Sequence, residues 1–159
     1  MAECCCPEPG TAGEPAACGV CHTSSKPVDS LTVKALLTES ALSRFEPAGY
    51  RFCPNADCDV VYFGEKAPAF SKPDVRVPVW QKESVGRRTI CYCFGENEAD
   101  IAEEIERSGK SFAVERVRTH IAAGRCACEV RNPKGACCLG DVTAAVERMR
   151  QIRLNEVRP

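Results

Sequence analysis

Residues 52–63, Phe-Cys-Pro-Asn-Ala-Asp-Cys-Asp-Val-Val-Tyr-Phe, place two cysteines on a short turn between two β-prone arms. The arms, Tyr50–Phe52 and Val60–Phe63, are rich in aromatic and β-branched residues. Such arms on either side of a turn that contains Pro, Asn and Asp are typical of a β-hairpin. We therefore expect a hairpin that carries Cys53 and Cys58 at one end.

A second pair of cysteines, Cys18 and Cys21, lies upstream of this hairpin. Two close thiol pairs on a chain that can fold back are suited to a sulfur-ligated metal, because each pair brings two donors together. We predict a structural zinc site with the ligands Cys18, Cys21, Cys53 and Cys58, which leaves no open position for water. Disulfides cannot pair all 13 cysteines, since the number is odd. His22 is expected to be an exposed neighbour of the site.

Composition along the 159 residues indicates an α+β fold made of two small domains. Within the first domain, Thr32–Phe45 has apolar residues at roughly helical spacing, although its β-branched residues leave a strand possible at its start. Val75–Trp80 alternates like an edge strand. The predicted parts are a flexible cysteine-rich tail over 1–17, a β-rich zinc-binding domain over 18–80, a linker over 81–88 and a helical domain over 89–159.

Helix signals fill the last of these parts. Asn97 and Ser111 are predicted N-caps of two helices, which Gly109 and Gly124 end. Asp141 is the predicted N-cap of a third helix. The cysteines of this region should therefore lie between helices, close to their N-terminal ends, where backbone N–H groups favour an anionic centre.

The remaining cysteines outside the tail form a second set of candidate metal ligands. Its members are Cys91, Cys93, Cys126, Cys128, Cys137 and Cys138. A second zinc competes here with an iron–sulfur cluster. The Cys-x-Cys spacing is narrower than that of a zinc knuckle, and helical surroundings differ from those of a zinc ribbon, so both features favour the cluster. The residues alone leave the choice open.

The charge balance argues against several classes of partner. The chain has 21 basic and 22 acidic residues and a net charge of −1, so neither nucleic acid nor a membrane surface is an expected partner. We see no signal peptide and no long apolar run, and we expect a cytoplasmic protein whose thiols stay reduced. No nucleophile with a recognisable base and no phosphate-binding loop occurs, so we predict no catalytic residues.

Three motifs in order carry a resemblance to a known family. They are residues 52–63, Cys91-Tyr92-Cys93, and Cys128-x3-Asn132-Pro133-Lys134-Gly135-Ala136-Cys137-Cys138. Over residues 18 to 155, the chain resembles the N-terminal region of the CopZ copper chaperone family.

This resemblance implies two metal centres. The zinc ligands would be Cys18, Cys21, Cys53 and Cys58, and a [2Fe-2S] cluster would take Cys91, Cys93, Cys128 and Cys138. The cluster half is similar to bacterioferritin-associated ferredoxin, and Cys126 and Cys137 would be surplus. Because the two centres have separate ligands, we expect loss of the zinc to leave the cluster largely intact.

The chain departs from the family pattern at both ends. The family continues into a heavy-metal-associated domain with a Met-x-Cys-x-x-Cys copper site, whereas this chain ends at Pro159 without one. It has instead the triplet Cys4-Cys5-Cys6, which the family pattern does not supply. Three thiols on a tail could bind a soft ion such as Cu(I), or could have no role.

The resemblance implies a role in copper or other soft-metal homeostasis. In that role a redox-active metallochaperone accessory would reduce Cu(II) to Cu(I) and hold it on thiols. Its partners would be soft metal ions and a metal-transporting ATPase, a metal-binding domain or a reductase. The alternative is a small ferredoxin-like electron carrier that docks to a reductase and has no copper role. A third possibility is that both metals are structural and the protein is an interaction module or a sensor of iron or oxidant.

Overall fold

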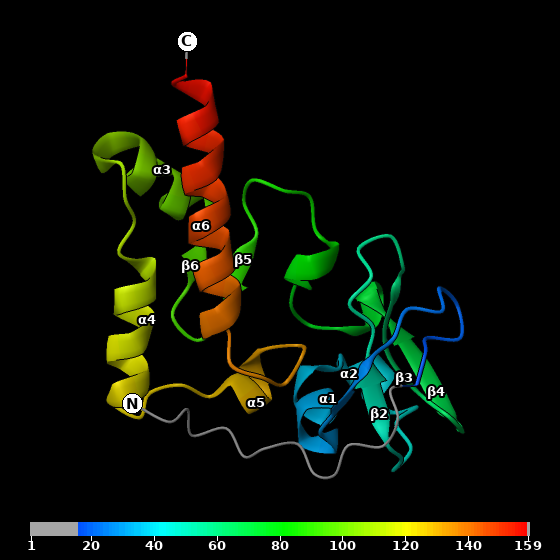
Figure 1. The fold of residues 1–159 in the computed structure, drawn as a ribbon. Helices are drawn as coiled ribbons and strands as arrows, with labels where there is room; N and C mark the ends of the chain where they lie inside the picture. Colours follow the sequence, from blue (N-terminus) through cyan, green and yellow to red (C-terminus); the bar gives the residue numbers. More distant parts are fainter. Residues whose placement is uncertain (1–15, 159) are drawn as a thin grey trace. The chain divides into compact units, whose positions relative to one another are not determined.

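The computed structural model describes residues 16–158, so Cys4, Cys5 and Cys6 lie outside the described residues. The fold is α+β, as predicted (Figure 1). It divides into two compact units. Of the described residues, the sheet unit contains 16–83 together with Glu129–Ala136, and the helical unit contains Ser84–Cys128 together with 137–158.

A four-stranded antiparallel sheet organises the sheet unit. Its strands lie in the order of the sequence: β1 (Lys26–Val28), β2 (Tyr50–Phe52), β3 (Val60–Gly64) and β4 (Ala67–Ser71). Phe52 pairs with Tyr62 across β2 and β3, so the predicted hairpin is confirmed. The strand β4 was not predicted, because Pro68 and the small residues beside it weaken its strand signal.

Two short helices precede the hairpin and confirm the helical prediction for this region. They are α1 (Ser30–Leu36) and α2 (Glu39–Leu42). The side chains of Asp29 and Thr38 cap them, since each accepts a hydrogen bond from a first-turn N–H. Val33 and Leu37 are buried in the core with the sheet residues Tyr50, Tyr62 and Phe70.

The predicted strand over Val75–Trp80 is wrong. Within this segment β-pairing is limited to Val75, which forms an isolated bridge with Leu37. The N–H of Arg76 donates to the carbonyl of Leu36 at the end of α1, so the segment pairs with a helix end instead of a strand. Two 3₁₀ turns, Lys72–Asp74 and Trp80–Lys82, flank it.

The helical unit combines a small two-stranded ribbon with helices. These elements are β5 (Thr89–Cys91), β6 (Glu96–Asn97), α3 (Glu98–Ser108), α4 (Ala113–Ala122) and α6 (Leu139–Glu156). α5 (Cys128–Arg131) begins in this unit and continues into the sheet unit. The helices α3 and α4 each lie against α6 (Figure 1).

The predicted helix ends are correct for α3 and shifted elsewhere. Asn97 caps α3 by accepting from the N–H of Asp100 at 3.0 Å, and Gly109 ends it in the left-handed region with φ of 77°. Ser111 accepts from the N–H of Ala113, the first residue of α4. α6 begins at Leu139 rather than after Asp141, because Cys138 occupies its N-cap position.

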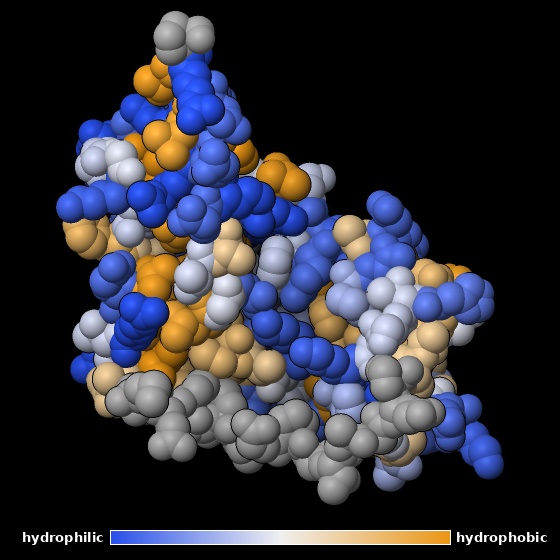
Figure 2. Space-filling model, viewed as in Figure 1, coloured by the Kyte–Doolittle hydropathy of each residue, from blue (hydrophilic) through white to orange (hydrophobic). Residues whose placement is uncertain are grey.

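Buried apolar residues on three helices form the interior of the helical unit. They are Ile101, Ile105, Val117, Ile121, Val142 and Ala145. Toward its C-terminal end α6 leaves Ile152, Leu154 and Val157 exposed, and apolar side chains show there at the top of Figure 2. No helix within residues 16–158 is long and apolar enough to cross a membrane.

Candidate metal centres

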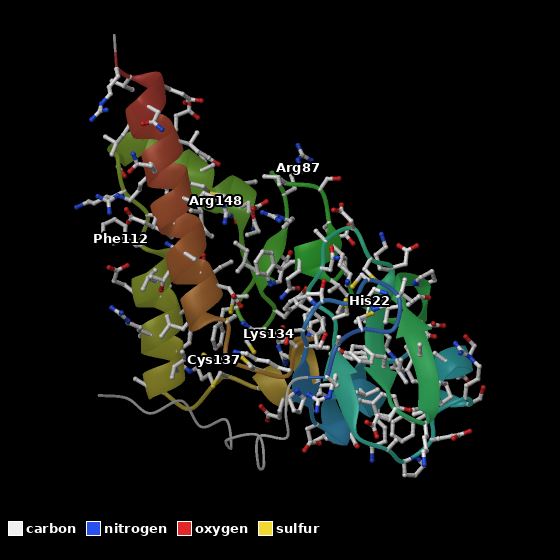
Figure 3. The ribbon with its side chains drawn as sticks, turned by 45° about the vertical axis from the view of Figure 1, so that its right-hand side comes forward. His22, Arg87, Phe112, Lys134, Cys137 and Arg148 are labelled. Atoms are coloured by element: carbon white, nitrogen blue, oxygen red, sulfur yellow. The ribbon has the colours of Figure 1, made fainter. Side chains whose placement is uncertain are left out.

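The first cysteine pair lies on a tight turn just before β1. The N–H of His22 donates to the carbonyl of Cys18 at 2.8 Å, and the N–H of Cys18 donates to the carbonyl of Thr23 at 3.0 Å. His22 itself adopts a left-handed backbone with φ of 58° (Figure 3). These contacts turn the chain back on itself, so that Cys18 and Cys21 come together.

The second pair lies on the turn at the end of the β2–β3 hairpin. The N–H of Cys53 donates to the carbonyl of Val61 at 2.9 Å, which continues the hairpin pairing up to the first thiol. The side chain of Asn55 accepts from the N–H of Asp57 at 2.9 Å and shapes the turn. Its amide nitrogen also lies 3.3 Å from the hydroxyl of Thr23, which links the two cysteine turns.

The structure brings the four sulfur atoms of the first set close together. The sulfurs of Cys18, Cys21, Cys53 and Cys58 lie within 4.8 Å of one another, and those of Cys21 and Cys53 are 3.5 Å apart. Zinc bound tetrahedrally at 2.3 Å would separate its sulfur ligands by about 3.8 Å. The donors, their number and their spacing therefore fit one zinc ion in a closed, four-sulfur site.

Burial shapes the acid–base chemistry of these thiols. Burial raises the pKa of Cys53 to about 12. A backbone hydrogen bond at Asn55 and the charge of Lys82 both lower this pKa, but burial has the larger effect. Burial also raises the pKa of Cys58. Hydrogen bonding with Thr23 instead lowers the pKa of Cys21 to about 6. Cys53 and Cys58 therefore keep their protons at neutral pH unless a cation replaces them.

A buried lysine completes the surroundings of this centre. The ammonium of Lys82 donates to the carbonyls of Asn55 and Cys58 at 2.7 and 2.8 Å, and only 7% of the residue is exposed. A zinc ion with four thiolates carries a net negative charge, so a cation beside it is favourable. From the sequence, Lys82 is assigned to a polar linker, because lysine is common in linkers and no local sequence pattern indicates that this residue is buried.

The second set of cysteines lies on four different pieces of the helical unit. Cys91 ends β5, Cys93 lies in the turn before β6, Cys128 begins α5, and Cys138 is the N-cap residue of α6. The N–H of Gly95 donates to the carbonyl of Cys91 at 2.8 Å, and φ of 73° at Gly95 completes this turn.

Four sulfurs of this set are neighbours in a row. The sulfurs of Cys93 and Cys128 are 3.7 Å apart, and Cys138 forms side-chain hydrogen bonds with both Cys128 and Cys91. Among residues 16–158, three or more donor atoms gather around a single point only at the first set. The contacts of the second set run from Cys93 to Cys128, then to Cys138 and then to Cys91.

The cysteines of this set differ in burial. Cys93, Cys126 and Cys137 are half-buried, whereas Cys91, Cys128 and Cys138 are almost fully buried. Figure 3 labels Cys137, which directly precedes the buried Cys138. None of the ten cysteines in the described part of the chain is in a disulfide.

Local hydrogen bonds change the pKa values of thiols in the second set. The N–H of Ala127 donates to the sulfur of Cys93 at 3.3 Å. Hydrogen bonding with Cys128 raises the pKa of Cys93 and of Cys138, whereas hydrogen bonding with Cys138 lowers that of Cys91. N–H donors to sulfur are among the groups that adjust the potential of iron–sulfur clusters.

Comparisons with known proteins agree with the zinc site. Residues 15–76 match the family model zf_CopZ, described as a zinc binding domain. The structure is similar to the X-ray structure of the Archaeoglobus fulgidus CopZ N-terminal domain, with a TM-score of 0.66 and 34% sequence identity. The match covers 80% of this chain and 95% of that one. No curated protein matches the chain significantly. This chain carries a CopZ-type zinc-binding domain and belongs to the family of the CopZ N-terminal domain.

Proposed function

We propose that this protein is a redox-active accessory of copper or other soft-metal homeostasis, which reduces Cu(II) to Cu(I) and holds the product on thiols. The row of thiols formed by Cys91, Cys93, Cys128 and Cys138 carries the proposal, because it occurs in a chain of the CopZ family. A [2Fe-2S] cluster held there supplies one electron at a time, which is the difference between Cu(II) and Cu(I).

Burial supports the choice of Cys91, Cys128 and Cys138, whereas Cys93, which is half-buried like Cys126 and Cys137, is chosen for its contact with Cys128. Cys138 is 2% exposed and hydrogen-bonds with two other members of the row, while Cys137 beside it is half-buried. The same contrast separates Cys128 from Cys126. Buried thiolates exclude water from the centre, and the N–H of Ala127 stabilises negative charge on the sulfur of Cys93.

Two pairs of neighbouring cysteines test this ligand assignment. Cys128→Ala and Cys138→Ala should each lose iron, sulfide and visible absorption, because each removes a ligand of the cluster. Cys126→Ala and Cys137→Ala are the matched controls and should retain all three. A Cys126 variant without the cluster, beside a Cys128 variant with it, would contradict the assignment.

Copper retention requires soft donors that the two centres do not use. Cys126, Cys137 and the triplet Cys4-Cys5-Cys6 are the thiols left for it. Thiolates suit Cu(I), because it is a soft ion that needs only two or three sulfur ligands. Of these thiols we propose the triplet as the site from which Cu(I) is passed to a partner, such as a metal-transporting ATPase or a metal-binding domain. The electron itself would come from a reductase.

The decisive experiment is an anaerobic titration of the reduced, full-length protein with Cu(II). We expect each equivalent of Cu(II) to oxidise one reduced centre, followed by absorption and EPR, and the Cu(I) formed to stay with the protein in a chelator competition. Deletion of residues 1–10 should weaken Cu(I) retention and leave iron and zinc contents unchanged. If Cu(II) does not oxidise the centre, the copper role is wrong and a ferredoxin-like electron carrier becomes the favoured function.

A further inference from the structure

The segment Glu129–Ala136 belongs to a different unit from the residues on either side of it. It is part of the sheet unit, whereas Cys128 and Cys137 belong to the helical unit. This segment is the piece of chain between two ligands of the proposed cluster, Cys128 and Cys138. Its conformation therefore affects how these two thiols are spaced.

Two hydroxyl groups of the sheet unit hold the segment at its start and its middle. Thr32 on α1 donates from Oγ1 to the carbonyl of Glu129 at 2.6 Å. Tyr62 on β3 donates from its hydroxyl to the carbonyl of Pro133 at 2.7 Å, in a buried hydrogen bond. Both side chains are fully buried in the core of the sheet unit, so they are rigid anchors.

The end of the segment is held by close packing. Gly135 has φ of 66°, a left-handed conformation that glycine adopts without strain. A Cβ atom on it would lie 2.9 Å from Oγ1 of Thr32 and 3.1 Å from a methyl group of Val28. Glycine is required here both for the backbone conformation and for the approach to α1 and β1.

The segment also has internal structure. Asn132 is 1% exposed, and its amide donates to the carbonyl of Ala136 at 2.7 Å. Its side-chain oxygen accepts from the N–H of Lys134, and its carbonyl accepts from the N–H of Gly135 at 2.8 Å. The loop is thus a folded turn with fixed ends (Lys134 and Cys137 mark it in Figure 3).

We propose that Thr32, Tyr62 and Gly135 are positioning residues for the cluster. The sheet unit holds the loop between Cys128 and Cys138 and so presents the two thiols at a fixed spacing. A metal centre is more stable when its ligands are held in place before it forms, because less conformational freedom is lost. This inference rests on the proposed [2Fe-2S] site.

The consequence is that the two metal centres are coupled, although they share no ligand. Zinc stabilises the unit that contains the anchors, so loss of zinc frees the loop and labilises the cluster. This replaces the expectation, drawn from the separate ligand sets alone, that the cluster would not respond to zinc.

A pair of tyrosine variants tests the positioning role. Tyr62→Phe keeps the ring in the core and removes the hydroxyl that holds Pro133. Tyr50→Phe is the matched control, because the hydroxyl of Tyr50 donates to the carbonyl of Glu46 in the same unit and does not reach the segment. With an iron chelator, we expect Tyr62→Phe to lose visible absorption about five- to thirtyfold faster than wild type. Its zinc content and the cluster of Tyr50→Phe should stay unchanged.

A pair of glycine variants gives an independent test. Gly135→Ala introduces both backbone strain and the contact with Thr32, so it should lower the iron content and keep the zinc. Gly109→Ala introduces similar strain at φ of 77° with no atom within 4 Å, and it should keep both metals.

The outcomes separate this inference from the proposed function. Iron loss at the control rate in both Tyr62→Phe and Gly135→Ala would overturn the positioning role and leave the cluster assignment standing. Wild-type protein that contains no iron and no sulfide after anaerobic purification would overturn the proposed function, and the positioning role with it.

Discussion

At the scale of single residues, Lys82 shows how the surroundings of a metal site extend beyond its ligands. We expect Lys82→Met to weaken zinc binding about ten- to a hundredfold, because it removes a charge and two hydrogen bonds from the turn that carries Cys53 and Cys58. Competition with a chromogenic zinc chelator measures this. Lys66→Met, at an exposed position between β3 and β4, is the control. Equal zinc affinity in both variants would show that Lys82 only packs.

The cysteine residues themselves could be chosen from the sequence, and Lys82 could not. The close spacing within each thiol pair identified the first set, because two donors a few residues apart can reach one ion. The choice of Cys138 over Cys137 came from the resemblance, and burial now favours it. Lys82 is buried by contacts with a turn far back in the chain, and no local pattern reports such contacts.

At the scale of elements, a buried carboxylate joins the start of α3 to its neighbours. Glu98 is fully buried, accepts from the N–H of Gly86 at 2.6 Å, and pairs with Arg88 and with Arg148 of α6. Burial alone would raise the pKa of Glu98, but the hydrogen bonds from Arg88 and Gly86 outweigh it and lower the pKa. The carboxylate is therefore charged in the folded protein over the whole neutral range.

We predict that Glu98→Gln destabilises the helical unit by about 3 to 5 kcal/mol at neutral pH, because it leaves buried arginine charge unpaired. The folded pKa is lower than the unfolded one, so the stabilisation is full above the unfolded pKa and is lost as the pH falls through the folded pKa. Urea unfolding of wild type and variant should therefore differ most at neutral pH, begin to converge below about pH 4 and become equal only when the pH is below the folded pKa.

The control for this prediction is Glu103→Gln on the same helix. Glu103 lies 3.9 Å from Arg107, and both side chains are more than 70% exposed, so this variant should change the free energy of unfolding by less than about 1 kcal/mol. A Glu98 variant as stable as the Glu103 variant would show that the buried network does not hold the unit together.

Elements were predictable where local chemistry defines both of their ends. The β2–β3 hairpin has a Pro-Asn-Asp turn, and α3 has Asn97 and Gly109 at its ends. The sequence failed where distant contacts decide the structure. Val75 bridges to Leu37 and not to a strand, and the start of α6 moves to Leu139 because Cys138 takes the N-cap position.

At the scale of the whole molecule, neither unit is one continuous stretch of the chain. Composition predicts one change from a β-rich to a helical region near residues 81–88, whereas the two units meet at three places along the described chain, after Glu83, Cys128 and Ala136. The return of Glu129–Ala136 to the sheet unit depends on Thr32 and Tyr62, which lie far away in sequence. No window of the sequence contains both partners of such a contact.

This return of the chain predicts a discontinuous pattern of hydrogen exchange. Removal of zinc by a chelator should increase exchange in the sheet strands between residues 26 and 71 and, to the same degree, in Glu129–Ala136, because these parts share one core. The helices α3 and α4 should keep their protection at first and lose it only as the cluster is lost. Exchange measured by mass spectrometry on the holo-protein resolves these segments. The opposite result is that residues 129–136 and α4 both stay protected after the strands have lost their protection. That result would show that the loop is held by the helical unit and not by Thr32 and Tyr62.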